Sequence, residues 1–464
     1  MGGLQGTLHG SLRSEIERHR RECGYTLSKL GELTGINHGS LSEILNGNPP
    51  RAMTIGQLDA LAAVFGREPG WMYEWYTEEC ISEGRISRPR LIPYLVRCAE
   101  VGRQDCIDEV VPKLLDNPRN ISTLFLVAEQ LYESGKQKES VPFYQAVVDS
   151  EKDGYSEQFV ISQYRLFRAA LGTNSEENGE AVIRFSPYRN RLPENYQLDA
   201  LFQLARVCYS LHKWKKSEQY ADELRYLAET IYIYELDRLK RDKKSELPET
   251  ERPLVYYYAM GHLYKGAILE MQGMYAQAKS YVQIYADLGW FELLDEVGHQ
   301  EVERFRIWAK ANLYTLEVLA GNTNTIEEYA DYLESLPPNE ILPGLISIIK
   351  SANIYDFCVD EILERFSMHI TNFGQYTDAI RLDRHLRFRY QAAIYEFAKG
   401  RLEKGIEETI CCLSLASLIN RFEDALKCIA LFEEYRQHAS PTQVERYQTI
   451  VTGRKKENLL PENN

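Results

Sequence analysis

Apolar residues recur at intervals of three and four along nearly the whole chain, and this period limits the possible folds more than any other feature. Leu124, Val127, Ala128 and Leu131 are one example. The spacing places these side chains on one face of an α-helix. The short alternating runs and two-residue turns that mark β-hairpins are missing from the sequence. The chain is therefore predicted to be all-α.

Helix pairs also repeat along the sequence. The tetratricopeptide pattern places large apolar residues and a small crossing residue on a first helix, then a turn glycine and a small residue on a second helix. Good matches lie at 125–147, 201–224 and 262–285, and weaker copies centre on Gly102, Gly172, Gly321, Gly374 and Gly400. One pair cannot bury its apolar faces alone, so the pairs stack. The sequence predicts a tetratricopeptide-like α-solenoid with an inserted loop near 230–254, where the charged run 235–252 is solvated.

The first residues have a denser pattern of helix caps and turns. Residues 11–66 are predicted to form five short helices, and four of them can be bounded as 11–22, 27–34, 38–45 and 54–65. Thr26 and Asn37 stand where a side chain can cap a helix N-terminus. Gly35 can adopt the positive φ that often ends a helix. Two short helices joined by this tight turn predict a helix-turn-helix.

The string TLSKLGELTGINHGSLSEILNG (26–47) resembles the helix-turn-helix of the lambda-repressor/XRE class, whose second helix lies in the major groove of DNA. The positions where that class buries apolar side chains hold Leu30, Leu33, Ile36, Leu41 and Ile44. The resemblance places the base-reading positions at His38, Gly39 and Glu43. A carboxylate can accept a hydrogen bond from the cytosine amino group, and an imidazole can donate one to guanine. Leu27 departs from the class, which often has glutamine there.

Other polar residues of this module suit DNA phosphates, whose contacts position a helix without reading the sequence. They are Thr26, Asn37, Ser40, Ser42, Asn46 and Arg51. The low basicity of the module implies weak DNA binding by a single copy, so a dimer on two half-sites of a double-stranded operator is expected. A small helical bundle with no role in DNA binding is the alternative interpretation.

The distribution of charge points to the same module. The chain has 54 Lys and Arg residues against 68 Asp and Glu residues, a net charge of −14. Residues 1–68 contain seven of each sign, so the excess negative charge lies in 69–464. An acidic body disfavours general nucleic-acid binding. The module at 1–68 is therefore the expected DNA-binding domain.

Three further segments follow the module. A linker helix is expected at 69–87, the repeat domain at 88–453 and a polar tail at 454–464. The linker contains the aromatic residues Trp71, Tyr73, Trp75 and Tyr76. Aromatic residues at helical spacing are more often buried than exposed. We expect this cluster to dock the module onto the repeats, with exposure to a partner as the alternative.

Motifs of catalytic and cofactor sites are missing from the sequence. It lacks the metalloprotease, P-loop, dinucleotide-binding, nucleophile-elbow and EF-hand patterns. None of the nine cysteines forms a CxxC pair. The sequence therefore predicts no catalytic residue, no cofactor and no metal, and a protein that is not an enzyme. Reduced, buried cysteines, no secretion signal and no apolar run of ~20 residues favour a cytoplasmic protein without membrane contact.

The order of the two parts resembles the RRNPP family of peptide-sensing regulators, which join an XRE helix-turn-helix to one tetratricopeptide array. The stretch REPGWMYEWYTEECI (67–81) after the module is most similar to the AimR (arbitrium) receptors. The resemblance implies a cytosolic quorum-sensing regulator in which a short linear signalling peptide binds the groove of the array and changes DNA binding. A Rap-like protein that acts on another protein, and a repeat scaffold with a vestigial DNA module, remain alternatives.

The groove of such an array is lined by inward-facing residues of the first helix of each pair. These positions hold Phe125, Glu129, Tyr132, Asp199, Phe202, Arg206, Tyr209, Arg387 and Tyr390. Tyrosine offers a large face with a polar tip, and arginine can hold a carboxylate. A peptide of roughly five to ten residues, whose backbone groups need polar partners, is expected near Arg206. The apolar stretch 406–435 is expected to form a homodimer contact.

Overall fold

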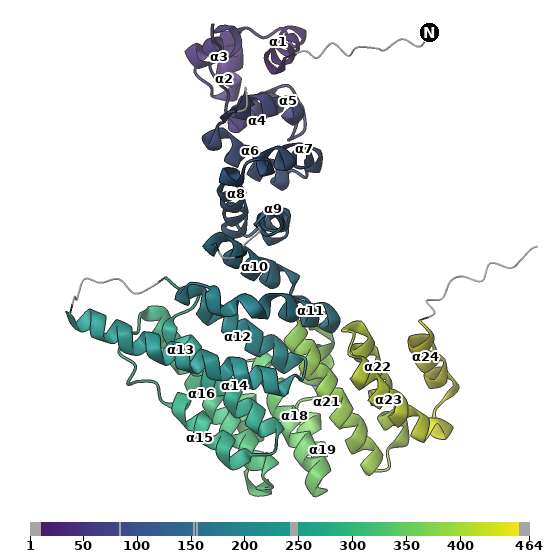
Figure 1. Cartoon of the computed structure of the whole chain (residues 1–464). Helices are drawn as coiled ribbons and strands as arrows, with labels where there is room; N and C mark the ends of the chain where they lie inside the picture. The colour runs from purple at the N-terminus through teal and green to yellow at the C-terminus, as the bar shows by residue number, and fades with distance from the viewer. Residues whose placement is uncertain (1–10, 83–84, 152–153, 155, 242–248, 454–464) are drawn as a thin grey trace, which may run out of the picture. The chain divides into compact units, whose positions relative to one another are not determined.

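The computed structural model describes residues 11–82, 85–151, 154, 156–241 and 249–453. It divides into two compact units, an N-terminal unit (Met1–Ala169) and a C-terminal unit (Ala170–Asn464). Apart from one pair of two-residue strands, the described elements are α-helices and short 3-10 helices (Figure 1). The all-α prediction is therefore confirmed.

The N-terminal unit contains the predicted helix-turn-helix and the first two repeat-like pairs. Its elements are α1 (Leu12–Glu22), α2 (Leu27–Thr34), α3 (His38–Asn46), α4 (Ile55–Val64), α5 (Tyr73–Cys80), β1 (Ile81–Ser82), β2 (Arg85–Ile86), α6 (Arg88–Glu100), α7 (Gln104–Leu115), η1 (Pro118–Asn120), α8 (Ile121–Glu133), α9 (Gln137–Ser150) and α10 (Glu157–Ala170).

The four bounded helices agree with the sequence to within one residue at each end, but the prediction of five helices in 11–66 is wrong. The next helix, α5, begins only at Tyr73. The linker helix was also predicted too long, because α5 ends at Cys80 and β1 pairs antiparallel with β2. The side chains of Ser11, Thr26, Asn37 and Thr54 cap α1 to α4 by accepting backbone N–H groups. Each cap satisfies a donor that the first helical turn leaves unpaired.

The linker aromatics dock as expected. Tyr73 and Tyr76 are fully buried. The Tyr73 hydroxyl donates to Asp59 of α4 (2.6 Å), and the Tyr76 hydroxyl donates to the carbonyl of Met53 (2.8 Å). Arg97 of α6 completes the contact through the other oxygen of Asp59 (2.8 Å). One apolar core consequently runs from α1 to α9.

The C-terminal unit continues the helical array. Its elements are α11 (Ser175–Phe185), η2 (Ser186–Arg191), α12 (Glu194–Ser210), α13 (Trp214–Arg241), α14 (Leu254–Met271), α15 (Tyr275–Ala286), α16 (Glu296–Leu319), η3 (Thr323–Thr325), α17 (Ile326–Glu334), α18 (Pro338–Tyr355), α19 (Asp360–Arg365), α20 (Ser367–Asn372), η4 (Phe373–Gln375), α21 (Ala379–Ala398), α22 (Leu402–Leu418), α23 (Phe422–Tyr435), η5 (Arg436–His438) and α24 (Pro441–Thr452).

Turn glycines mark most of the helix pairs. Gly102, Gly135, Gly273, Gly321 and Gly400 have positive φ between two helices. Positive φ is the conformation in which glycine has no Cβ penalty.

Some repeat predictions are corrected. The loop predicted near 230–254 is partly wrong, because α13 remains helical to Arg241, and residues 242–248 lie outside the described residues. Gly374 lies within η4 rather than in a helix-pair turn. Cys358, expected to be buried, is exposed.

In the C-terminal unit, helices from the beginning of the array contact helices from its end. Consecutive helices from α12 to α16 pack in order, and α18, α21, α22 and α23 continue the series. α12 also contacts α21, and the backbone N–H of Ser175 donates to the carbonyl of Ile419 (3.0 Å). Figure 1 shows α11 and α12 beside the green and yellow helices of the C-terminal end. The first and last parts of this unit therefore lie together.

Candidate nucleic-acid interface and ligand cavity

The second helix of the helix-turn-helix, α3, presents most of the predicted DNA-contacting residues to solvent. His38, Gly39 and Glu43 are exposed, while Leu41 and Ile44 on the opposite face are buried. Of the predicted phosphate contacts, Thr26, Asn37, Asn46 and Arg51 are exposed, and Ser40 and Ser42 are half-buried. Leu33 was expected in the core but is 44% exposed. The module therefore has one buried and one polar, accessible face.

Two glycines allow α2 and α3 to meet at a close angle. Gly35 ends α2 with a φ of 70°. Gly31 lies within α2, and a Cβ added there would stand 2.8 Å from the carbonyl oxygen of Ile36. Real Cβ atoms do not approach oxygen so closely without a shift of the backbone, so only glycine fits this contact. Sequence reasoning had not singled out Gly31, although a glycine inside a helical stretch signals such a contact.

Two residues with different predicted roles pair with each other. The Arg51 guanidinium donates to the Glu43 carboxylate (3.0 Å) and to the Ser40 hydroxyl (3.4 Å). Both side chains are more than half exposed, so the pair adds little stability. It does neutralise an acidic side chain that would otherwise repel DNA phosphates.

A second arginine, missed by sequence reasoning, joins the module to the following helix. Arg13 of α1 donates to the carbonyls of Ile44 (2.8 Å) and Arg51 (3.2 Å), and it pairs with Glu79 of α5 (2.6 Å). The Glu79 carboxylate is nearly buried and also accepts the backbone N–H of Met53 (3.2 Å). The C-terminal end of α3 is thereby held against α1 and α5.

Three predicted peptide-binding residues belong to an internal cluster of the N-terminal unit. The Glu129 carboxylate accepts two hydrogen bonds from Arg165 (3.0 and 3.1 Å) and one from the Tyr144 hydroxyl. The Arg165 guanidinium lies 3.8 Å from the ring centre of Tyr132, and the ring of Phe125 contacts that of Tyr144. These contacts join α8, α9 and α10. Phe125, Glu129 and Tyr132 are thus engaged in packing and do not line the cavity described next.

The C-terminal unit encloses a cavity of about 400 Å³ between its helices. Four of the predicted peptide-binding residues line it: Phe202, Arg206, Tyr209 and Arg387. Aromatic side chains from other helices, including Tyr256, Tyr264 and Trp308, complete a large part of its wall. The volume lies within the range of ligand sites, which combine apolar walls with a few polar groups.

Asp199 lies outside this wall. Its side chain is buried and accepts hydrogen bonds from the Tyr257 hydroxyl (3.3 Å) and the Gln203 amide (3.4 Å). The position one turn later on α12 holds Phe202, whose ring packs against Tyr256 and Tyr264. The prediction that Asp199 faces a ligand is therefore corrected to a role in packing α12 against α14.

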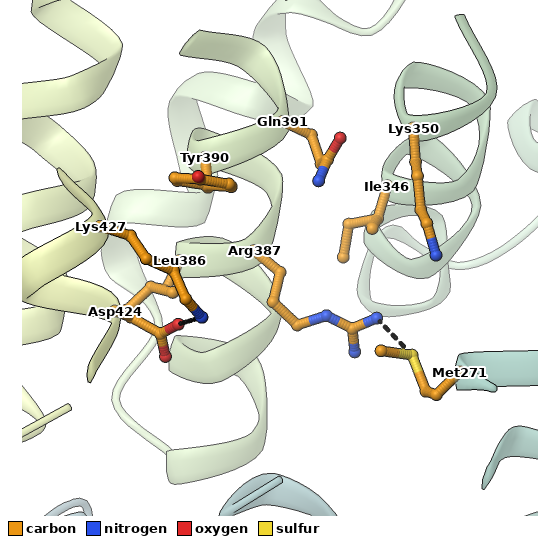
Figure 2. Close-up of a pocket in the computed structure, with 9 residues that line it drawn as sticks. All are labelled: Met271, Ile346, Lys350, Leu386, Arg387, Tyr390, Gln391, Asp424 and Lys427. Atoms are coloured by element: carbon orange, nitrogen blue, oxygen red, sulfur yellow. Dashed lines mark hydrogen bonds and ion pairs between the residues drawn. The ribbon is translucent and has the colours of Figure 1, made fainter. Parts of the chain in front are cut away.

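A smaller cavity of about 120 Å³ adjoins the first and shares Ile346, Lys350 and Arg387 with it. Figure 2 shows the residues that line the smaller cavity, among them Arg387, whose guanidinium points toward Met271 and lies 3.3 Å from its sulfur. Tyr390, also predicted to bind the peptide, lines only this smaller space. Arg387 and Tyr390 were predicted from a weak repeat, yet the fold brings both to these cavities.

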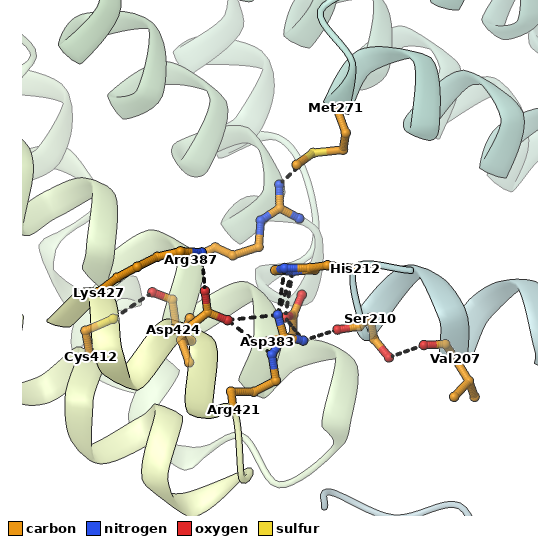
Figure 3. Close-up of polar contacts among 11 residues, drawn as sticks. Val207, Ser210, His212, Met271, Asp383, Arg387, Cys412, Arg421, Asp424 and Lys427 are labelled. Atoms are coloured by element: carbon orange, nitrogen blue, oxygen red, sulfur yellow. Dashed lines mark hydrogen bonds and ion pairs between the residues drawn. The ribbon is translucent and has the colours of Figure 1, made fainter. Parts of the chain in front are cut away.

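A cluster of charged residues closes one end of the C-terminal unit beside the cavities. Arg421 follows α22 and is almost fully buried. It donates to Asp424 (2.8 Å), Asp383 (3.3 Å) and His212 (2.7 Å), and also to the carbonyl of Ser210 (Figure 3). We call these five residues the Arg421 cluster. It joins the α12–α13 turn to α21 and α23, which are about two hundred residues away in sequence.

The electrostatics of this cluster favour the ionised form of Asp424. Burial alone would raise the pKa of Asp424, but the hydrogen bond from Lys427 and the charge of Arg421 outweigh burial and lower it. Asp383 lines the larger cavity and belongs to the cluster. Asp383 is therefore part of both the cluster that closes the array and the wall of the larger cavity.

Comparison with known proteins identifies the N-terminal module. Residues 16–72 match the helix-turn-helix family HTH_3. A search of curated proteins found no match to the chain. The match points to a DNA-binding regulator of transcription rather than an enzyme. Among the described residues, no helix is long and apolar enough to cross a membrane, and no group of three His, Cys, Asp or Glu side chains is placed to hold a metal ion.

Proposed function

We propose that this protein is a peptide-responsive transcription regulator that binds operator DNA through α2 and α3 and a short linear peptide in the C-terminal cavity. The observation that carries the proposal is the cavity itself, because aromatic walls and free polar groups meet there in a chain that also has a helix-turn-helix. The resemblance to RRNPP regulators, and to AimR receptors in particular, supports the peptide as ligand. A bound peptide would change DNA binding by altering the homodimer.

Peptide binding is expected to depend on Arg206. This side chain is half-buried in the cavity wall, with its guanidinium 5.8 Å from the ring centre of Phe202. Arg206→Ala should weaken the peptide at least ~10-fold, since a charge-assisted hydrogen bond would be lost. Titration calorimetry with a peptide retained by the full-length protein measures this. The matched control is Arg241→Ala, an exposed arginine of α13. Equal affinities of the two variants would place the site elsewhere.

Sequence preference on DNA is expected to depend on His38 and Glu43. Each lost base contact should reduce discrimination between operator and random DNA by ~1–3 kcal/mol. Glu43→Ala also frees Arg51 for phosphate, so non-specific binding should stay constant or rise. Fluorescence anisotropy on selected and scrambled duplexes separates the two effects, with Arg18→Ala on exposed α1 as control. A double variant that keeps full preference would contradict this assignment and favour a Rap-like protein partner.

The homodimer contact is expected at the junction of α22 and α23. Leu418, Phe422 and Leu426 are about two thirds exposed at a spacing of four residues. The other face of the same helices, with Leu413 and Phe432, is buried in the array. Phe422→Glu should convert a dimer to a monomer in analytical ultracentrifugation, because a self-complementary interface carries the change twice. Tyr226→Glu, equally exposed on α13, is the control. A Phe422→Glu variant that remains dimeric would exclude this surface.

A further inference from the structure

The larger cavity holds more basic than acidic groups without an oppositely charged partner. Arg206, Lys350, Arg384 and Arg387 line it, together with the carboxylate of Glu270. Among the described residues, none of these five side chains lies within 4.0 Å of an oppositely charged group. Within this set of five, four cations face one anion, although the chain as a whole has a net charge of −14.

Two of the three other carboxylates of the wall, Asp378 and Asp383, have cationic partners. Asp378 caps α21 and accepts the backbone N–H of Arg381 (3.0 Å), and it also pairs with the side chain of that arginine (3.5 Å). Asp383 belongs to the Arg421 cluster. Glu340 accepts a hydrogen bond from the neutral Asn339 amide (3.0 Å), which leaves its negative charge in place. With Glu340 counted, four cations of the wall stand against two carboxylates that lack a cationic partner.

Half-buried charges without oppositely charged partners are unfavourable, since burial removes water that stabilises the charge. Burial lowers the pKa of Lys350 and raises that of Glu270, in each case disfavouring the charged form. The guanidinium of Arg387 donates to the thioether of Met271 (3.3 Å), which is a weak acceptor. An incoming carboxylate would replace this contact with a much stronger one.

We infer that the ligand of this cavity is an acidic peptide, which carries acidic side chains in addition to its C-terminal carboxylate. This inference rests on the proposed peptide-binding function and adds the chemical class of the peptide. The cations come from three separate helices, α12, α18 and α21. Carboxylates spaced along an extended chain match such a distribution, whereas a single phosphate requires donors that converge on one point. Glu270 can accept the peptide's N-terminal ammonium group.

The test uses three libraries of synthetic hexapeptides with free termini, random except at two fixed positions that are glutamate, glutamine or lysine. Full-length protein is incubated with each, and the retained peptides are measured by mass spectrometry after gel filtration. The glutamate library should be retained at least tenfold more than the glutamine library, and the lysine library least. Arg387→Gln and Lys350→Gln should each reduce this preference. Arg241→Gln, on the exposed end of α13, should leave it unchanged. Melting temperatures confirm that the variants are folded.

The outcomes separate the two proposals. Equal retention of the three libraries, or preference for lysine, would overturn the acidic class while leaving the peptide-binding function in place. Retention of no library would overturn both. Displacement of the glutamate library by equimolar inorganic pyrophosphate would assign the cations to a phosphate-bearing ligand and overturn the inference. An equal loss in Arg241→Gln and Arg387→Gln would also overturn it, because the effect would then not arise in the cavity.

Discussion

Replacing Arg421 with methionine is expected to lower the free energy of unfolding of the C-terminal unit by about 3–5 kcal/mol, the range for breaking a buried ion pair from one side. The substitution removes the donor to Asp383 and Asp424, both of which are less than a tenth exposed. Methionine fills part of the volume but leaves the buried side chains of Asp383 and Asp424 without their arginine. The contact with the α12–α13 turn is lost as well.

Urea unfolding measures this change, and Trp214 offers a local signal because its ring stacks on His212 at a centroid distance of 4.9 Å. Arg436→Met is the matched control. Its exposed pair with Glu433 is screened by solvent, so this variant should unfold at nearly the same urea concentration as the wild type. Adding Asp383→Asn and Asp424→Asn to Arg421→Met should recover part of the loss, since the buried negative charges are then removed. A loss below ~1 kcal/mol for Arg421→Met alone would show that the cluster does not hold the array closed.

Acidification from pH 7 to pH 5 is expected to destabilise the C-terminal unit by about 2 kcal/mol for each of two buried histidines, His262 and His385. Burial, with nearby Arg225 and Arg389 respectively, lowers the pKa of both from 6.5 to about 4. The unfolded chain therefore takes up protons below pH 6.5 that the folded chain takes up only near pH 4. Unfolding is favoured throughout this window as the pH falls, and full stability is present above it.

The contacts of the two histidines agree with neutral rings. Nε2 of His385 accepts a hydrogen bond from Arg389 (2.9 Å), which requires an unprotonated nitrogen. His262 packs against the rings of Tyr258 and Tyr281, with Asp222 as the nearby opposing charge. Urea unfolding at pH 7 and pH 5 should show a smaller difference for His262→Gln/His385→Gln than for the wild type. His438→Gln, on the exposed surface, should change nothing. Equal differences for all three proteins would contradict this prediction.

The helix-turn-helix could be predicted closely because its determinants are local. Capping by Thr26 and Asn37, and the positive φ of Gly35, act within a few residues of the helix ends they define. Local signals of this kind are readable in a single sequence. The exposure of Leu33 could not be predicted in the same way, since it depends on which face of α2 the neighbouring helices cover.

The cavity was predictable in part. Phe202, Arg206 and Tyr209 lie on one face of α12, and helical periodicity was enough to group them. Lys350 and Arg384 could not be found, because they reach the cavity only through the return of α18 and α21 toward α12. Periodicity also placed Glu129 inward without indicating Arg165, which lies 36 residues away and engages its carboxylate. Tertiary structure decides which charged residues form ion pairs, and the repeat pattern in the sequence does not predict these pairs.

The closure of the array also has a consequence for biosynthesis. A chain leaves the ribosome from its N-terminus, and domains generally fold as they emerge. The helix-turn-helix and its neighbours make mostly local contacts, so they can fold early. The cavity wall extends to Arg387, and the residue that closes the array is Arg421. The DNA-binding module of each nascent molecule is therefore expected to fold before the ligand cavity, and a chain truncated before Arg421 would lack both the closure of the array and most of the proposed dimer contact.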